Sequence, residues 1–109
     1  MATHEFGIMK KPPTKGERYD VYEPNQYECL SVDDDNIEPL LGALFEVKCY
    51  WHTLDVLGQG LAYCGITLIP PQSLDEIMGV IEMQKELMNL KQLLEQAKKK
   101  GCYVIHFGI

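Results

Sequence analysis

The chain has 109 residues, of which 46% are hydrophobic and 24% are charged, and its formal net charge at pH 7 is −6. This length and composition are typical of one globular domain, and no apolar run approaches the ~20 residues that cross a bilayer. Between positions 19 and 84 there are twelve acidic residues and one base, Lys48. Such a segment would repel phosphates, so we expect no nucleic-acid partner. Because no apolar run is long enough to span a bilayer, we also expect no membrane partner.

The N-terminus and the cysteines indicate the compartment. Residues 1–5 lack the basic flank and apolar core of a signal peptide, so we expect a cytoplasmic protein. No C-x-x-C pair occurs, and the usual zinc and thioredoxin spacings are therefore absent. We expect no metal and no cofactor, and free thiols at all four cysteines, Cys29, Cys49, Cys64 and Cys102.

Residues 1–26 are interpreted as an N-terminal arm that packs on a single α+β domain, residues 27–109. Residues 6–9 could form a short strand, but Pro12, Pro13, Gly16 and Pro24 interrupt any regular element after it. The arm contains too many tyrosines for a solvated tail, so it should wrap around the domain.

The next elements are a strand at 29–32 and a short helix at about 37–45. Asp35 or Asn36 would cap the helix, because Pro39 fits only within a first turn. The same acidic cluster could suggest a calcium loop, but it lacks the alternating acids, central glycine and distal glutamate of an EF-hand. Capping is the better interpretation.

Residues 46–53 and 61–69 are predicted to form a hairpin with a loose turn that contains Gly58 and Gly60. The apolar alternation predicts a register in which Cys49 lies opposite Cys64, and Tyr50 opposite Tyr63.

The remaining residues predict one long helix and a last strand. Ser73 and Glu76 have the spacing of a capping box, and Gly101 comes after a lysine-rich last turn, so the helix should span residues 74–100. The last strand is a run of high β-propensity at 103–107. The order β-α-β-β-α-β predicts a ferredoxin-like fold: a four-stranded antiparallel sheet of order 4-1-3-2 with two helices on one face.

Four segments resemble a set of small bacterial cytosolic proteins of unknown activity: Glu5-Phe6-Gly7-Ile8-Met9, Cys49-Tyr50-Trp51-His52-Thr53, Leu61-Ala62-Tyr63-Cys64-Gly65-Ile66-Thr67-Leu68-Ile69-Pro70-Pro71 and His106-Phe107-Gly108-Ile109. The resemblance covers nearly the full length and implies no activity, cofactor or catalytic residue.

The residues that could carry chemistry are His52, His106 and Cys29. In the expected sheet order, the two histidines lie on opposite edges, roughly 14 Å apart, which is too far for a shared metal or a direct proton relay. Cys29 and His106 would lie on neighbouring strands, where a nucleophile and base could meet. The alternative interpretation is that His106 is an edge-strand histidine bonded to backbone, and we expect no catalytic residue.

Two surfaces could take part in association. The sheet face opposite the helices should carry Tyr50, His52, Leu61 and Tyr63, covered either by the arm or by a second subunit. The second surface is the helical stripe Met83, Leu87, Leu90 and Leu94, because a 27-residue helix would overhang a short sheet. This stripe predicts a homodimer.

The sequence therefore favours a non-catalytic interaction module: a small acidic protein that binds a macromolecular partner, as an immunity protein or antitoxin does, or that self-associates. The alternative is a small enzyme or ligand-binding domain on the open sheet face. In that case Arg18 would fix an anionic group and His52 would handle a proton, with Tyr50 and Tyr63 beside them.

Overall fold

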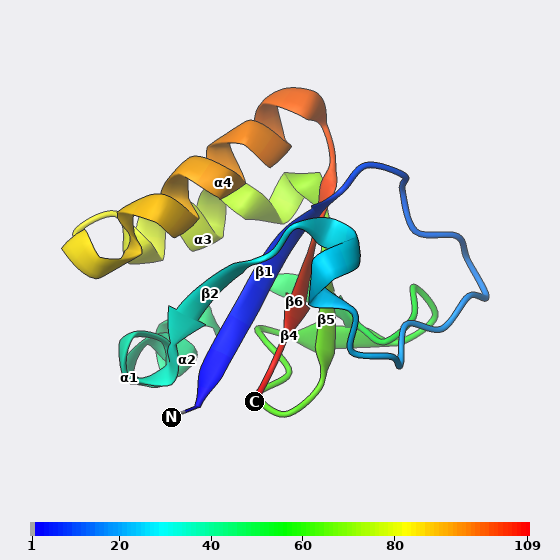
Figure 1. The fold of residues 1–109 in the computed structure, drawn as a ribbon, viewed down its shortest axis with the longest axis horizontal. Helices are drawn as coiled ribbons and strands as arrows, with labels where there is room; N and C mark the ends of the chain where they lie inside the picture. The colour runs from blue at the N-terminus through cyan, green and yellow to red at the C-terminus, as the bar shows by residue number, and fades with distance from the viewer. Residues whose placement is uncertain (1) are drawn as a thin grey trace.

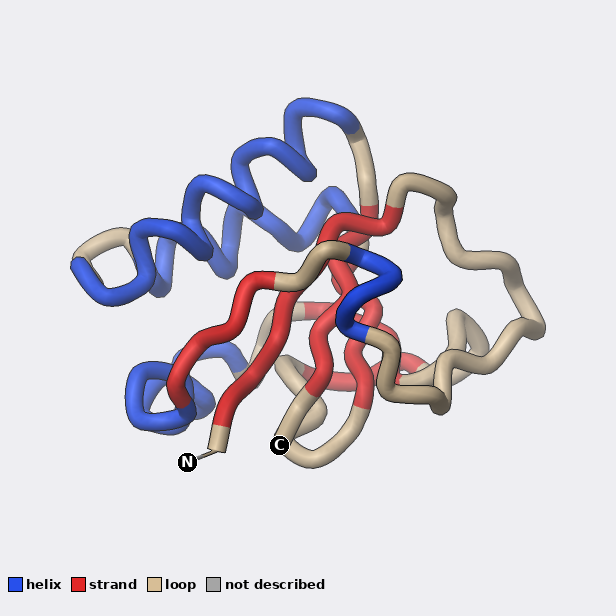
Figure 2. The backbone as a smooth tube through the Cα atoms, viewed as in Figure 1, coloured by secondary structure: helices blue, strands red, loops and turns tan. Residues whose placement is uncertain are grey.

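The computed structural model describes residues 2–109 and contains one six-stranded, entirely antiparallel sheet (Figures 1 and 2). The strands are β1 (Thr3–Met9), β2 (Leu30–Asp33), β3 (Lys48–Trp51), β4 (Leu57–Gln59), β5 (Ile66–Ile69) and β6 (Tyr103–Phe107). They lie in the order β2-β1-β6-β5-β3-β4. The predicted four-stranded ferredoxin-like sheet is therefore wrong.

The first correction concerns the N-terminal arm, whose beginning is strand β1. This strand pairs with β2 on one side and with β6 on the other, with Phe6 opposite both Leu30 and His106. Its alternation places His4 and Phe6 on the helix-covered face, while Met9 lies on the other face. As a result β6 is an internal strand rather than an edge strand.

The second correction concerns the predicted hairpin. The turn between its strands contains a strand of its own, β4, and β3 pairs with both β4 and β5. Tyr50 lies opposite Leu57 on one side and opposite Leu68 on the other, instead of opposite Tyr63. The predicted register is wrong because residues 61–65 form a loop before β5 begins.

A series of short helical turns comes after β2: α1 (Asp34–Ile37), the 3₁₀ turn η2 (Glu38–Leu40) and α2 (Leu41–Leu44). The acidic cluster does cap a helix, as predicted, but the cap is Asp33, whose side chain accepts a hydrogen bond from the Asp35 backbone at 2.9 Å. Pro39 lies in η2, where the α-helical pattern is interrupted.

The predicted 74–100 helix is a helical hairpin, which Figure 1 shows as α3 and α4 lying side by side. It consists of η3 (Pro71–Ser73), α3 (Leu74–Ile81), η4 (Lys85–Leu87) and α4 (Met88–Lys100). Ser73 makes no capping bond; its hydroxyl donates to the Lys48 carbonyl at 2.6 Å. The predicted end at Gly101 is confirmed, with φ of 68° and a bond from its N–H to the Lys98 carbonyl.

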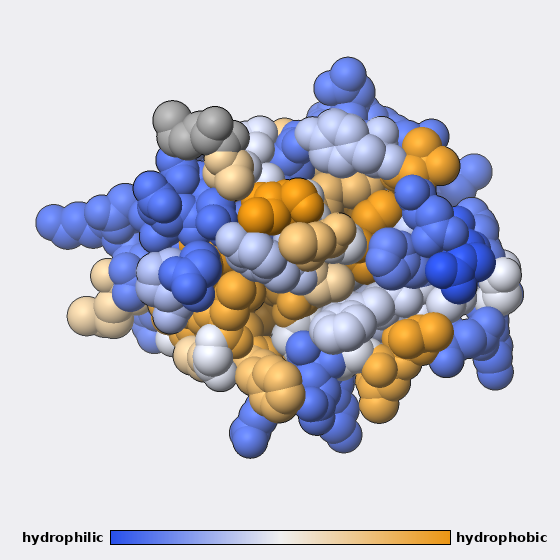
Figure 3. Space-filling view, turned by 90° about the horizontal axis from the view of Figure 1, so that it is seen from below, coloured by the Kyte–Doolittle hydropathy of each residue, from blue (hydrophilic) through white to orange (hydrophobic). Residues whose placement is uncertain are grey.

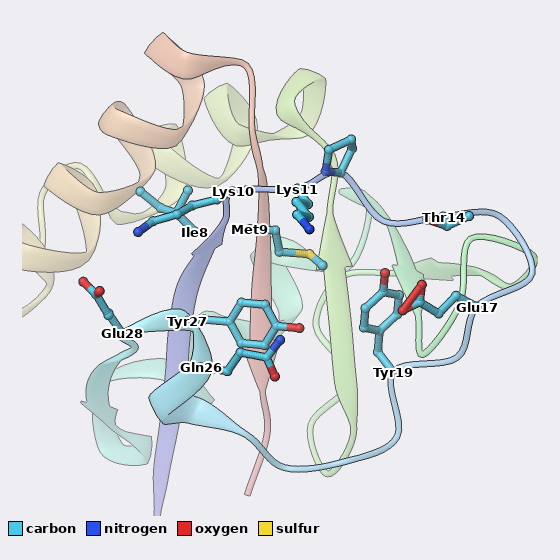
Figure 4. Close-up of a pocket in the computed structure, with 11 residues that line it drawn as sticks. Ile8, Met9, Lys10, Lys11, Thr14, Glu17, Tyr19, Gln26, Tyr27 and Glu28 are labelled. Carbon is cyan, nitrogen blue, oxygen red and sulfur yellow. The ribbon is translucent and has the colours of Figure 1, made fainter.

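Both faces of the sheet are covered. The helices pack on one face over a large core that includes Phe6, Leu74 and Leu94. The other face carries a smaller core around Leu68, Ile105 and Phe107, against which the segment between β1 and β2 packs, including the 3₁₀ turn η1 (Pro24–Tyr27). Figure 4 shows Tyr19 and Tyr27 of this segment lying over the strands.

Hydrophobic residues reach the surface at a few places. Figure 3 shows them in the middle of one face, bordered by hydrophilic side chains. Within residues 2–109, no helix is both long enough and apolar enough to span a membrane.

Candidate functional site

The main polar feature of the interior is a pair of histidines on neighbouring strands. His4 of β1 and His106 of β6 are both 0% exposed, and their rings stack with centroids 5.1 Å apart. His4 Nδ1 lies 2.8 Å from His106 Nε2. Two fully buried imidazoles in direct contact are costly unless their nitrogens are all paired.

Every ring nitrogen of the two histidines has a hydrogen-bond partner, and donors and acceptors alternate in one direction along the network. His4 Nε2 lies 2.8 Å from Asp34 Oδ1, and a carboxylate can only accept, so Nε2 donates. His4 Nδ1 then accepts from His106 Nε2, and His106 Nδ1 accepts from the Thr67 hydroxyl at 3.2 Å. Thr67 Oγ1 in turn accepts from the Ala62 backbone at 2.8 Å. All of these hydrogen bonds can form with both imidazoles neutral.

The electrostatics agree with the neutral form. Burial, with a smaller effect of His4, lowers the pKa of His106 to about 3. At the outer end of the chain, hydrogen bonds from His4 and Tyr63 lower the pKa of Asp34 below its usual range. The hydrogen bond to Asp34, with desolvation as the second largest cause, raises the pKa of Tyr63 to about 12.

This histidine network joins β1, β5 and β6 to helix α1 and to the 61–65 loop. It consists of the side chains of His4, Asp34, Tyr63, Thr67 and His106. Its five side chains line none of the four cavities described for residues 2–109. A relay of this kind could pass a proton, but a reaction also needs a place for substrate beside it. The arrangement joins these elements to one another, and the lowered pKa of the buried His106 makes that attachment sensitive to acid.

The structure separates the predicted nucleophile–base pair. Cys29 packs in the smaller core, on the opposite face of the sheet from His106. Burial raises the pKa of the Cys29 thiol to about 12, and that of Cys49 also to about 12. Neither thiol suits nucleophilic chemistry at neutral pH.

The predicted partner face is not one surface. Leu61 is buried in the helix-side core, Tyr50 packs in the smaller core, and Tyr63 bonds to Asp34. Tyr19, Tyr27 and Cys29 of the segment between β1 and β2 pack on this face of the sheet, as the interpretation of an arm that wraps around the domain expected.

Arg18 and His52, two of the predicted site residues, do lie close together. Asp20, which was not predicted from the sequence, contacts both of them. Asp20 Oδ2 accepts from Arg18 Nε at 2.8 Å, and Asp20 Oδ1 lies 2.9 Å from His52 Nδ1. The segment between β1 and β2 therefore folds back to bring Arg18 near His52, as the enzyme alternative required. Tyr50 and Tyr63 do not line the cavity that His52 lines.

The predicted dimer stripe belongs mainly to the core. Leu87, Leu90 and Leu94 are at most 2% exposed, whereas Met83, at the turn of the helical hairpin, is 86% exposed. The predicted overhanging helix is wrong, because the chain folds back on itself at residues 82–84.

A groove of about 580 Å³ lies between α4 and the β1–β2 edge of the sheet. Its lining comprises Ile8, Lys10, Tyr27, Glu28, Leu30, Asn89, Gln92, Leu93, Gln96, Lys100 and Cys102. A second hollow of about 310 Å³ shares Ile8, Lys10, Tyr27 and Glu28 with it. Figure 4 shows this second hollow, with Met9 and Tyr27 between its two sides.

Within residues 2–109, no group of three or more His, Cys, Asp or Glu side chains is arranged to hold a metal ion. No family model, curated protein or solved structure matches the chain.

Proposed function

We propose that this protein is an interaction module that binds an extended peptide segment of a protein partner in the groove between α4 and β2. The observation that carries the proposal is a groove with a row of side-chain amides on its helical wall and Leu30, the first residue of the edge strand β2, on the other wall. Strand β2 is the last strand on its side of the sheet. Edge strands offer unpaired backbone groups, to which an extended peptide can add.

The helical wall of the groove supports a peptide ligand. Asn89, Gln92 and Gln96 line it at spacings of three and four residues, so they lie along one face of α4. An amide side chain both donates and accepts, as a peptide backbone does. From Asn89 to Lys100 the helix rises about 16 Å, which matches about five residues of extended chain.

The floor and one end of the groove add specificity. Ile8, Leu30 and Leu93 supply apolar contacts for a side chain of the ligand. Lys100 ends α4, and Lys10 comes directly after β1, whose last residue pairs with Tyr103. Both lysines therefore lie at the same end of the groove. Together with Glu28 they leave one net positive charge there, which favours a ligand carboxylate.

The test is selection of peptides from a random displayed library on the immobilised full-length chain, followed by fluorescence anisotropy with the selected synthetic peptides. We expect enriched sequences with an acidic group or free carboxyl end beside an apolar residue. The Gln92→Ala and Gln96→Ala variants should each weaken binding by about 0.5–1.5 kcal/mol.

A matched pair of lysines provides the control. Lys100→Gln should weaken binding by about 0.2–1 kcal/mol, while Lys99→Gln, which changes the same charge outside the groove lining, should leave it unchanged. The proposal is wrong if no peptide is enriched, or if the selected peptides bind all four variants as tightly as the unmodified chain.

A further inference from the structure

An exposed thiol lines the same cavity as the Asp20–His52 pair, at a site separate from the proposed peptide groove. Cys64 is exposed and lines a cavity of about 180 Å³ together with His52 and Asp20. Tyr22, Ile66 and Phe107 supply apolar walls, and Gly65 and Gly108 supply backbone. The thiol, the imidazole and the carboxylate come from three segments that are far apart in the sequence.

The imidazole of His52 is oriented as a base. Its Nδ1 lies 2.9 Å from Asp20 Oδ1 and 3.2 Å from the Tyr19 carbonyl oxygen. Both oxygens accept, so Nδ1 carries the proton and Nε2 has the free lone pair. Arg18 holds Asp20 from the other side at 2.8 Å, and its hydrogen bond lowers the pKa of that carboxyl.

The backbone fixes the ring over the residue next to the thiol. His52 has φ of 65°, its N–H donates to the Ile66 carbonyl at 2.9 Å, and its carbonyl accepts from the Tyr19 N–H at 2.7 Å. A Cβ atom built on Gly65 would lie 2.8 Å from His52 Nε2. A side chain at position 65 would therefore have to displace the His52 ring, and Nε2 lies close to the backbone of the residue next to Cys64. Left-handed backbone at a non-glycine residue is a feature of functional sites.

We propose that Cys64 is a nucleophile, with His52 as its general base and Asp20 as a positioning residue, and that it accepts acyl groups from small activated esters that enter this cavity. The Cys64 thiol passes its proton to His52 Nε2 while the sulfur forms a bond to the carbonyl carbon. The ester C–O bond then breaks, and the leaving oxygen takes the proton from His52. The product is a thioester on Cys64 and a free alcohol, with no oxidant or reductant required.

The test uses p-nitrophenyl acetate on the full chain, with release of nitrophenolate followed by absorbance and the acetylated residue located by peptide mass spectrometry. We expect a burst of one nitrophenolate per chain and an acetyl group on Cys64. The His52→Gln variant should acylate at least about 10²-fold more slowly, as loss of a general base predicts. Asp20→Asn should slow acylation and shift its pH profile, and Asp20→Glu should restore part of the rate.

A second reagent tests the site without any substitution near it. Iodoacetamide at pH 7 should modify Cys64 at least about tenfold faster than the half-buried Cys102 in the same molecule. Equal rates at the two cysteines, acetylation elsewhere, or unchanged acylation in the folded His52→Gln variant would each overturn the proposal. Fluorescence of Trp51 confirms that each variant is folded.

Discussion

The buried histidine network predicts that the protein loses stability as the pH falls from 7 to 5. In the unfolded chain His106 binds a proton below its ordinary pKa of about 6.5. In the folded chain its pKa is lowered to about 3, so it stays neutral throughout this range. Below pH 6.5 the unfolded state therefore binds more protons than the folded state, and acid favours unfolding.

The loss of stability depends on the interval between the His106 pKa in the unfolded chain, about 6.5, and that in the folded chain, about 3. Each pH unit below 6.5 lowers the free energy of unfolding by about 1.4 kcal/mol, so at pH 5 His106 lowers it by about 2 kcal/mol in total. The whole free energy of unfolding of a domain of this size is typically only about 5–15 kcal/mol. The lowered pKa of Asp34 acts in the same direction, but its contribution is lost only below its usual value of 3.8. The window from pH 5 to 6.5 therefore separates the effect of His106 from that of Asp34.

Urea unfolding at pH 7, 6 and 5, followed by the fluorescence of Trp51, measures this effect. The His106→Gln variant keeps a donor for His4 but does not titrate, so it should lose about 2 kcal/mol less than the unmodified chain between pH 7 and 5. His52→Gln, outside the network, should retain the full dependence on His106. A flat stability of the unmodified chain across this range, or an unchanged slope in His106→Gln, would refute the reasoning.

Two further predictions concern the helical hairpin, and both are measured by urea unfolding. Leu94→Ala should cost about 2–5 kcal/mol because Leu94 is fully buried, whereas Met83→Ala should change little because Met83 is 86% exposed; equal effects would mean that the helix does not fold back. Gly101→Ala should destabilise by about 1 kcal/mol because of its φ of 68°. Gly79→Ala, in α3 with nothing near its Cβ position, should stabilise by about 0.5–1 kcal/mol; the opposite order would contradict the two backbone conformations.

Local signals in the sequence were informative where one residue decides the structure. Gly101 ends α4 because a left-handed residue is needed there, and Asp33, the last residue of β2, caps α1 because its side chain accepts from a free backbone N–H. The break between α3 and α4 has no such signal, since residues 82–84 include neither glycine nor proline. It is favoured by the burial of Leu87, Leu90 and Leu94 against the same sheet as α3, which a helical pattern alone cannot reveal.

A short strand at residues 6–9 was considered, but its extension to Thr3 and its place in the sheet between β2 and β6 were not predicted, and for this reason the histidine network was missed. His4, Phe6 and Ile8 alternate with Glu5, Gly7 and Met9, a pattern of period two that predicts a strand. Without that strand, β6 becomes an edge and His106 has no buried partner. The contact between His4 and His106 spans 102 positions and depends on the sheet order, which no local pattern specifies.

The segment between β1 and β2 links both proposed sites to one feature of the topology. Because β1 and β2 are neighbours in the sheet, a connection between them could have been short; here it takes twenty residues, 10–29, and crosses the second sheet face. On one side this connection supplies Lys10, Tyr27 and Glu28 to the peptide groove, and further along it places Asp20 against His52. A loop that only covered the core would need its apolar residues alone. Both proposals therefore rest on the charged residues that this connection brings to two separate hollows.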